Sequence, residues 1–159
     1  MRTAEEAYSS LLSRLRCGLG KDRSLWPLLS GQSKSGSKPC RCQLRCPSCP
    51  TTSRAIHPAL RSEFLRLSDF HQLLDENPRL KEIELSNYGE IFLNLELLPI
   101  IAYAYERHVI LRADNGVNLN HVRENVLEGL VKYQFRSMTC PIDGASDATY
   151  SIYRVRGRL

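Results

Sequence analysis

Three strand-like segments recur in this chain at nearly equal intervals, and each is followed by a segment with helical spacing or a helix cap. They begin near residues 81, 108 and 134, which are 27 and 26 residues apart. A strand and its crossover helix need about 30 residues, so this interval predicts βα units and a parallel sheet. We predict an α/β chain with strands over 81–86, 108–113 and 134–139.

Helix signals lie before, between and after these strands. Ser68 is predicted to cap a helix over 68–77. The next helix is expected to begin at about Leu98, because Pro99 fits only the first turn of a helix. Ser146 is predicted to cap a last helix. Helical spacing between the second and third strands is carried by Val122, Val126, Leu127 and Leu130.

Polar residues recur on one alternating face of every predicted strand. Strands buried on both faces of a parallel sheet are nearly continuous apolar runs, so polar residues need another explanation. We infer that this face lines a polar cavity in a curved or partly closed barrel. The residues concerned are Glu84, Ser86, Arg112, Asp114, Ser137 and Thr139.

Composition is that of an ordinary globular domain. The chain has 159 residues, of which 42% are hydrophobic and 25% charged, enough for one domain with a real core. No apolar run approaches the ~18 residues of a membrane span, and the N-terminus lacks the apolar core of a signal peptide. Six cysteines without an export signal favour a reducing compartment. We expect a cytoplasmic protein with no membrane partner.

The net charge of +5 is unevenly distributed. Residues 1–66 carry 12 Lys and Arg against 4 Asp and Glu, whereas residues 67–159 carry 10 against 13. A basic segment of this kind meets nucleic acid or an acidic electron donor, or is simply solvated. Residues 30–39 are rich in Ser, Gly and Lys, as in a linker. We predict a weakly structured basic segment over 1–39 and a folded domain over 40–159.

Cys42, Cys46 and Cys49 share one short loop, with three residues between the first two and two between the last two. Thiolates select zinc, copper(I) or iron–sulfur clusters. A structural zinc site usually takes two separated pairs of ligands, and here only Cys40 is left to complete a compact zinc knuckle. Three thiolates can instead hold a 4Fe-4S cluster and leave one iron open for a small ligand.

Two further motifs, Asn87-Tyr88-Gly89-Glu90 and Ile142-Asp143-Gly144-Ala145, follow the cysteine loop in the sequence. With them, the segment from about Cys40 to Gly157 resembles the radical S-adenosylmethionine (radical SAM) superfamily. The resemblance implies a 4Fe-4S cluster whose open iron is chelated by the amino and carboxylate groups of S-adenosylmethionine. It also implies one-electron cleavage to methionine and a 5′-deoxyadenosyl radical, which abstracts a substrate hydrogen.

The resemblance assigns further residues to the cofactor. Gly89 and Glu90 match a motif that binds the amino group of S-adenosylmethionine, since a glutamate accepts hydrogen bonds from an ammonium group. Arg154 matches an arginine that binds the methionyl carboxylate through its planar fork. Pro141 stands where the family often has a ribose-binding serine, and Asp143 is the substitute that we consider.

The family's fold is a six-unit (βα) barrel, and this sequence is expected to form a partial one of about three to four units. A flavodoxin- or ferredoxin-like protein is the implied electron donor. The substrate stays unnamed, because the family selects it mostly through later parts of the barrel. Two alternatives remain open: a non-catalytic zinc knuckle that binds nucleic-acid phosphates, and a truncated fragment without activity of its own.

Overall fold

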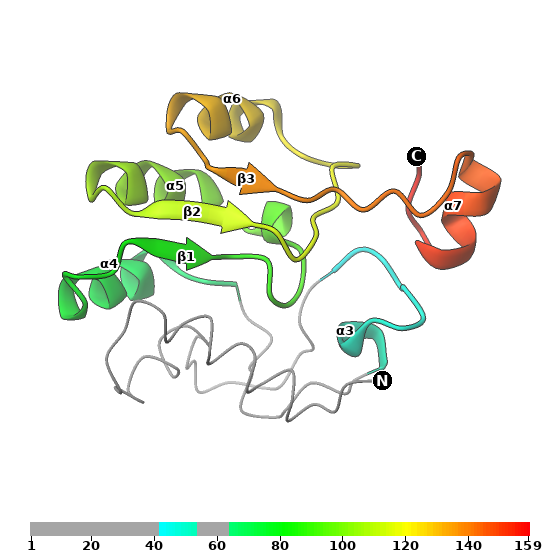
Figure 1. Cartoon of the computed structure of the whole chain (residues 1–159), viewed down its shortest axis with the longest axis horizontal. Coiled ribbons are helices and arrows are strands. Elements are labelled where there is room, and N and C mark those ends of the chain that lie inside the picture. The colour runs from blue at the N-terminus through cyan, green and yellow to red at the C-terminus, as the bar shows by residue number, and fades with distance from the viewer. Residues whose placement is uncertain (1–41, 54–63) are drawn as a thin grey trace.

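The computed structural model describes residues 42–53 and 64–159 (Figure 1). The predicted basic segment 1–39 and the additional cysteine Cys40 lie outside the described residues. The described elements, in chain order, are α3 (Pro50–Ser53), α4 (Leu67–Glu76), β1 (Glu82–Glu84), the 3-10 helix η2 (Ile91–Leu93), α5 (Leu97–Glu106), β2 (Ile110–Ala113), α6 (Glu124–Lys132), β3 (Ser137–Met138) and α7 (Asp147–Tyr153).

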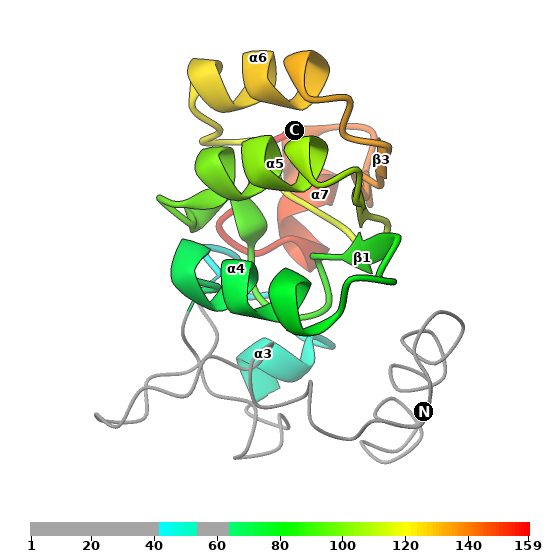
Figure 2. The same cartoon turned by 90° about the vertical axis from the view of Figure 1, so that its left-hand side faces the viewer.

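The three strands form one parallel sheet in the order β1-β2-β3. Arg112 is opposite Glu84 on one side and Ser137 on the other. Helices α4, α5 and α6 lie side by side in a layer against one face of this sheet (Figure 2). The observed architecture is therefore an α/β layer of parallel strands and helices, and its continuation into a partial barrel stays a prediction.

The hydrophobic core lies between the helices and the sheet. Helix α4 buries three residues at helical spacing, so a single stripe of it faces the core. Helix α5 is the central helix and buries four residues. The most deeply buried large side chains are Phe70, Leu73, Leu74, Ile100, Ile101 and Val126.

The strands have two to four residues, fewer than the six predicted for each. At the carboxyl ends of β1 and β2, side chains accept hydrogen bonds from backbone N–H groups. Glu84 accepts hydrogen bonds from the backbone N–H of Ser86 at 2.8 Å and of Asp114 at 2.9 Å. The Ser86 hydroxyl accepts from the backbone N–H of Asn115 at 3.0 Å. Strand pairing therefore stops where Glu84 and Ser86 supply the acceptors.

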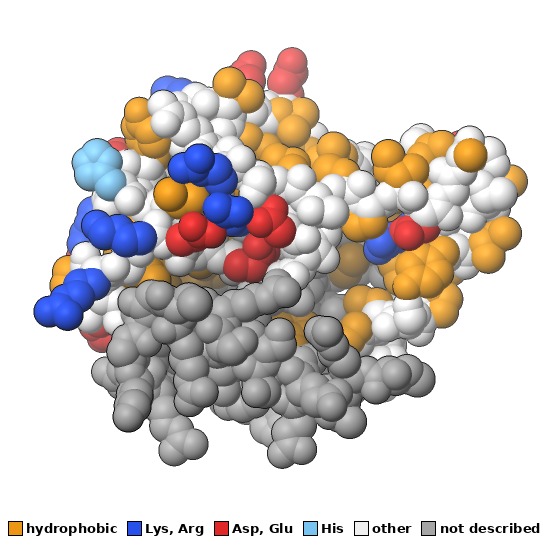
Figure 3. All heavy atoms as spheres, viewed as in Figure 1, with side chains coloured by type: hydrophobic (Ala, Val, Ile, Leu, Met, Phe, Trp, Pro, Cys, Tyr) orange, Lys and Arg blue, Asp and Glu red, His pale blue; other side chains and the backbone are white. Residues whose placement is uncertain are grey.

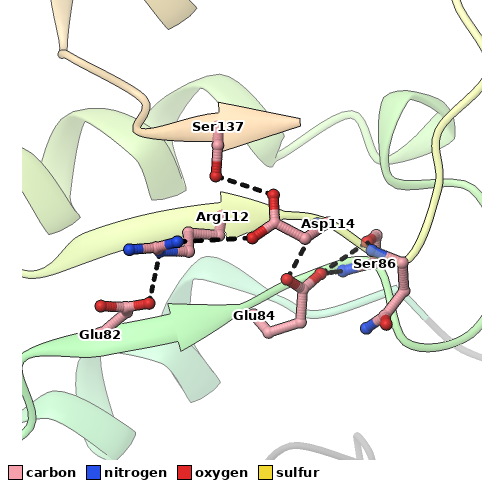
Figure 4. A network of polar contacts seen from close by, with 7 residues as sticks. Glu82, Glu84, Ser86, Arg112, Asp114 and Ser137 are labelled. Atoms are coloured by element: carbon pink, nitrogen blue, oxygen red, sulfur yellow. Dashed lines mark hydrogen bonds and ion pairs between the residues drawn. The ribbon is translucent and has the colours of Figure 1, made fainter. Parts of the chain in front are cut away.

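The face of the sheet opposite the helices carries a polar network (Figure 4). Arg112 forms ion pairs with Glu82 and with Asp114, and the Ser137 hydroxyl donates to Asp114 at 2.7 Å. The predicted polar residues Glu84, Arg112, Asp114 and Ser137 thus lie together on one face. Their enclosure in a barrel cavity stays a prediction.

Helix boundaries agree with the sequence at some ends and differ at others. Ser146 caps α7 as predicted, accepting from the Thr149 N–H at 3.3 Å in a reciprocal capping box. The prediction that Ser68 caps α4 is wrong, because the helix already begins at Leu67. Glu96, from the start of α5, accepts a hydrogen bond from the Leu67 N–H at 2.5 Å. A carboxylate distant in sequence therefore does the work of a local cap.

Helices α5 and α6 end in the same way. In each, the residue after the C-cap has a positive φ, 56° for His108 and 52° for Gln134. The next N–H in each case bonds back to the last full turn, Val109 to the Ala104 carbonyl and Phe135 to the Leu130 carbonyl, both at 2.8 Å. This is the Schellman ending, in which glycine is the usual residue.

Replacing either residue with glycine should relieve the strain of a left-handed backbone. We expect His108→Gly to raise the free energy of unfolding by about 0.5–1 kcal/mol, because the strain relieved exceeds the entropy that glycine adds to the unfolded chain. Urea denaturation measures the change. His121→Gly is the matched control, since His121 is an exposed turn residue without a positive φ, and it should lower stability or leave it unchanged. Equal losses in both variants would contradict the strain argument.

Candidate functional site

A pocket of about 150 Å³ lies at the carboxyl ends of the strands. In Figure 1 this is the end toward which the strand arrows point, with α3 and α7 beyond it. Its walls come from the cysteine loop, from the turns at 86–90 and 115–118, and from Pro141, Tyr150 and Arg154. Segments distant in sequence thus meet at the carboxyl ends of the strands, where the active sites of βα barrels lie.

The cysteine loop is held mainly by the C-terminal segment. The Arg45 N–H donates to the Val155 carbonyl at 2.9 Å, and the Ser48 and Tyr153 hydroxyls are hydrogen-bonded to each other. A Cβ on Gly157 would lie 3.0 Å from the Leu44 side chain, so this glycine allows close packing against the loop. The loop therefore depends on the residues around α7 for its position.

All three predicted metal-binding cysteines line the pocket as free thiols. Cys46 is buried at 5% exposure, and Cys42 and Cys49 are partly buried. Burial raises the pKa of the Cys42 thiol, although a hydrogen bond with the Leu44 backbone opposes this. Cys140, by contrast, is exposed and outside the pocket lining.

In residues 42–53 and 64–159, no three His, Cys, Asp or Glu side chains are grouped as ligands of a single metal ion. Cysteines that hold an iron–sulfur cube bind separate iron atoms, so they surround a cluster and do not converge on one point. Three thiols on the wall of one pocket fit that donor set chemically. The volume is below the ~300 Å³ at which small-molecule sites begin, so ligand binding requires the pocket walls to move apart.

Arg154 joins two predicted site residues. Its guanidinium forms an ion pair with Asp143, and its Nη1 lies 3.6 Å from the Cys46 Sγ. Helix α7 ends at Tyr153, so Arg154 is the C-cap residue and projects from a fixed helix end. Because Asp143 already forms an ion pair with Arg154, Asp143 orients the guanidinium. The predicted contact of Asp143 with a cofactor stays a prediction.

Glu90 is buried at 4% exposure on the same pocket wall. One carboxylate oxygen accepts from the Phe92 N–H at 3.2 Å, which caps η2, and the other accepts from the Asn118 N–H at 2.7 Å. Burial raises the pKa of the Glu90 carboxyl to about 7, against the opposing effect of these two hydrogen bonds. Each oxygen keeps a second lone pair with which it can accept from a ligand.

Gly89 precedes this glutamate with a φ of 82°, a left-handed conformation that favours glycine. The position therefore has a structural need for glycine in addition to its predicted contact with a ligand. Asn115, in the neighbouring turn, donates from its side chain to the Asn87 side chain at 2.8 Å. These two turns support each other.

Two pocket residues, Tyr150 and Asn118, were not predicted from the sequence. Tyr150 is buried at 6% exposure and lies one helical turn before Arg154 on α7, so the spacing of the two was an available signal. Asn118 accepts from the Asn120 N–H at 2.8 Å and from the Gln43 side chain at 3.3 Å. No sequence signal marked Asn118, because it lies in the polar segment 115–121.

The chain matches no protein-family model, no curated protein and no solved structure. Among the helices of the described residues, none combines the length and the apolar character that crossing a membrane requires.

The buried Glu90 carboxyl should make folding stability depend on pH. Its folded pKa of about 7 is above the ordinary value of 4.5, so between these pH values only the folded chain keeps the proton. The contribution of Glu90 to stability is therefore greatest below pH 4.5 and is lost as pH rises through 7, a decline of about 3 kcal/mol. Urea denaturation of the metal-free chain at pH 5 and pH 8 measures the decline.

The variant Glu90→Gln distinguishes the contribution of this carboxyl to the pH dependence of stability from that of the other acidic groups. The amide can accept only one of the two N–H groups, so the variant should be less stable than the original chain at pH 5 but lose little more at pH 8. Glu128→Gln, at an exposed position on α6, should retain the full decline. The assignment is wrong if Glu90→Gln and the unaltered chain decline equally.

Proposed function

We propose that this chain is a radical SAM protein, which binds a 4Fe-4S cluster through Cys42, Cys46 and Cys49 and S-adenosylmethionine beside it. The observation that supports the proposal most is the single pocket at the carboxyl ends of the strands. It brings the cysteine triplet together with Gly89, Glu90 and Arg154, which the sequence resemblance assigned to the same cofactor. A chance set of thiols gives no reason for those segments to meet.

The residues have separate roles in this proposal. The three thiolates would hold the cluster. When bound, the cluster would pass on the electron with which S-adenosylmethionine is cleaved. Arg154 offers a planar fork for the methionyl carboxylate once its Nη1 leaves Cys46. Glu90 accepts from the ammonium group through its free lone pairs, and Asp143 keeps Arg154 oriented. Glu90 accepts these hydrogen bonds best when its carboxyl group is ionised. Because its pKa is raised to about 7, this requires a pH above about 7.

The wider setting follows from the same proposal. The sheet is the first part of a (βα) barrel, and its polar face belongs to the barrel interior. A flavodoxin- or ferredoxin-like donor delivers the electron, and an acidic protein of that kind suits a chain with a net charge of +5. The substrate class is left open, and a cytoplasmic location remains part of the proposal.

Anaerobic iron–sulfur reconstitution tests the proposal directly. We expect about four irons per chain and an electron paramagnetic resonance spectrum that changes when S-adenosylmethionine is added. One zinc per chain, with no iron and no response to S-adenosylmethionine, would replace the proposal with the zinc-knuckle alternative. In that case binding to arbitrary nucleic acid should weaken steeply as salt is raised.

Cysteine variants test the ligand assignment. Cys46→Ala should abolish cluster loading, because the two remaining thiolates would not retain the cluster. Cys140→Ala should load as much iron as the unaltered chain, since Cys140 lies outside the pocket lining. Iron content after reconstitution and desalting is the measurement. Equal loading of the two variants would refute the assignment of Cys46.

An arginine variant tests the cofactor contact at constant iron content. Arg154→Gln should keep the cluster and weaken S-adenosylmethionine binding by about tenfold, the effect of losing about 1.4 kcal/mol from a charge-assisted contact. Titration monitored by the paramagnetic resonance spectrum gives the dissociation constant. Arg158→Gln is the matched control, because Arg158 is exposed and outside the pocket lining. Unchanged affinity in Arg154→Gln would remove Arg154 from the cofactor site.

A further inference from the structure

A second and larger cavity, of about 390 Å³, lies at the opposite end of the sheet from the cysteines. It is bounded by the C-terminal ends of α5 and α6 and by the chain leading into β2 and β3. Its volume is within the ~300–1,000 Å³ range of small-molecule sites. The proposed radical SAM function makes no use of this end of the fold.

Two of the three described non-glycine residues with a positive φ line this cavity, and the third, Arg156, lies after α7. His108 and Gln134 occupy the two Schellman positions, where glycine is the usual residue. A loop with only a structural role needs no side chain at that position. Non-glycine residues in a left-handed conformation gather at ligand sites, where the side chain has a use that outweighs the strain. The repetition in two neighbouring loops around one cavity makes this explanation stronger than for either residue alone.

The walls of the cavity combine aromatic rings with polar groups. The Tyr105 and Tyr133 rings lie 5.9 Å apart between centroids and are tilted by 55°, and Phe135 joins them in the lining. Tilted neighbouring rings of this kind offer faces and edges against which a flat ring can pack. The lining also contains an exposed arginine, Arg136, on the loop that leads into β3.

The side chains that line the cavity favour an anion. None of the described residues that line the cavity is Asp or Glu, whereas Arg136 and His108 both offer N–H donors. The Lys132 ammonium lies 5.1 Å from the centroid of the Tyr133 ring, which adds a second positive group nearby. Figure 3 shows Lys and Arg side chains gathered at the end of the molecule where the strands begin.

We propose that this cavity binds a small planar aromatic anion. The ring packs against Tyr105, Tyr133 and Phe135, and the anionic group, a carboxylate or a phosphate, pairs with Arg136. His108 and Gln134 complete the site with side-chain N–H donors. This site is independent of the cysteine pocket, so it stands or fails separately from the radical SAM proposal.

Titration of the full chain with phenyl phosphate tests the site. We expect a dissociation constant of about 1 mM, with the backbone amide signals of residues 108–111 and 133–136 moving most. Inorganic phosphate, which has the anion without the ring, should bind at least about tenfold more weakly. Sodium benzoate should compete with phenyl phosphate if the site recognises the negative charge of the anion and not the shape of a phosphate group.

Three variants locate the contacts. Arg136→Gln should weaken phenyl phosphate binding by at least about fivefold, since a guanidinium pairs directly with the anion. The double variant His108→Gly, Gln134→Gly keeps a backbone that glycine adopts readily, so it should fold normally and bind about threefold or more weakly. Arg154→Gln, in the cysteine pocket, should bind as the unaltered chain does.

The proposal is overturned by any of three results. These are equal affinity in Arg136→Gln and the unaltered chain, equal binding of inorganic phosphate and phenyl phosphate, and signal changes confined to residues outside the cavity. Competition by benzoate supports a site for carboxylates and phosphates together, and its failure restricts the site to phosphates, provided the phenyl phosphate results hold.

Discussion

The buried carboxylate of Glu90 joins the two turns on which the cysteine pocket depends. Glu90 itself ends the turn after β1, and it accepts one backbone N–H from η2 and another from the turn after β2, so one side chain fixes the two turns relative to each other. Glu84, the last residue of β1, also connects these two parts of the chain, because it accepts from the N–H of Asp114 just after β2. Two acidic residues therefore hold the segments after β1 and β2 together where strand pairing ends, and one of them, Glu90, lines the pocket.

The opposite wall of the pocket is built by a different means. The cysteine loop has a backbone that turns tightly into α3. Arg45, Ser48 and Cys46 connect it to the segment around α7, and Gln43 connects it to Asn118. Gly144 allows this segment to pack closely, because a Cβ there would overlap the backbone of Thr149 and Tyr150. Packing at the start of α7 thus sets where Arg154 emerges at its end.

The sequence predicted the features of the fold that depend on local sequence patterns. The spacing of apolar residues and turns pointed to βα units, and Ser146 showed where α7 begins. The early end of β2 and the capping of α4 by Glu96 could not be foreseen, because each depends on a side chain from a distant segment. In the candidate site, the motif residues were identifiable by resemblance, whereas the Asp143–Arg154–Cys46 contacts required the folded chain. Tyr150 was identifiable in principle from its position one turn before Arg154.

The separation between Cys46 and Arg154 also has a consequence for biosynthesis. The two residues are 108 positions apart, so at about 5–20 residues per second a ribosome makes the arginine roughly 5–20 s after the cysteine. During that interval the thiols exist without the guanidinium and without the C-terminal segment that holds their loop. Assembly of the pocket therefore waits until the chain around Arg154 has been made, and any metal centre is inserted after that or on a loop that is still free.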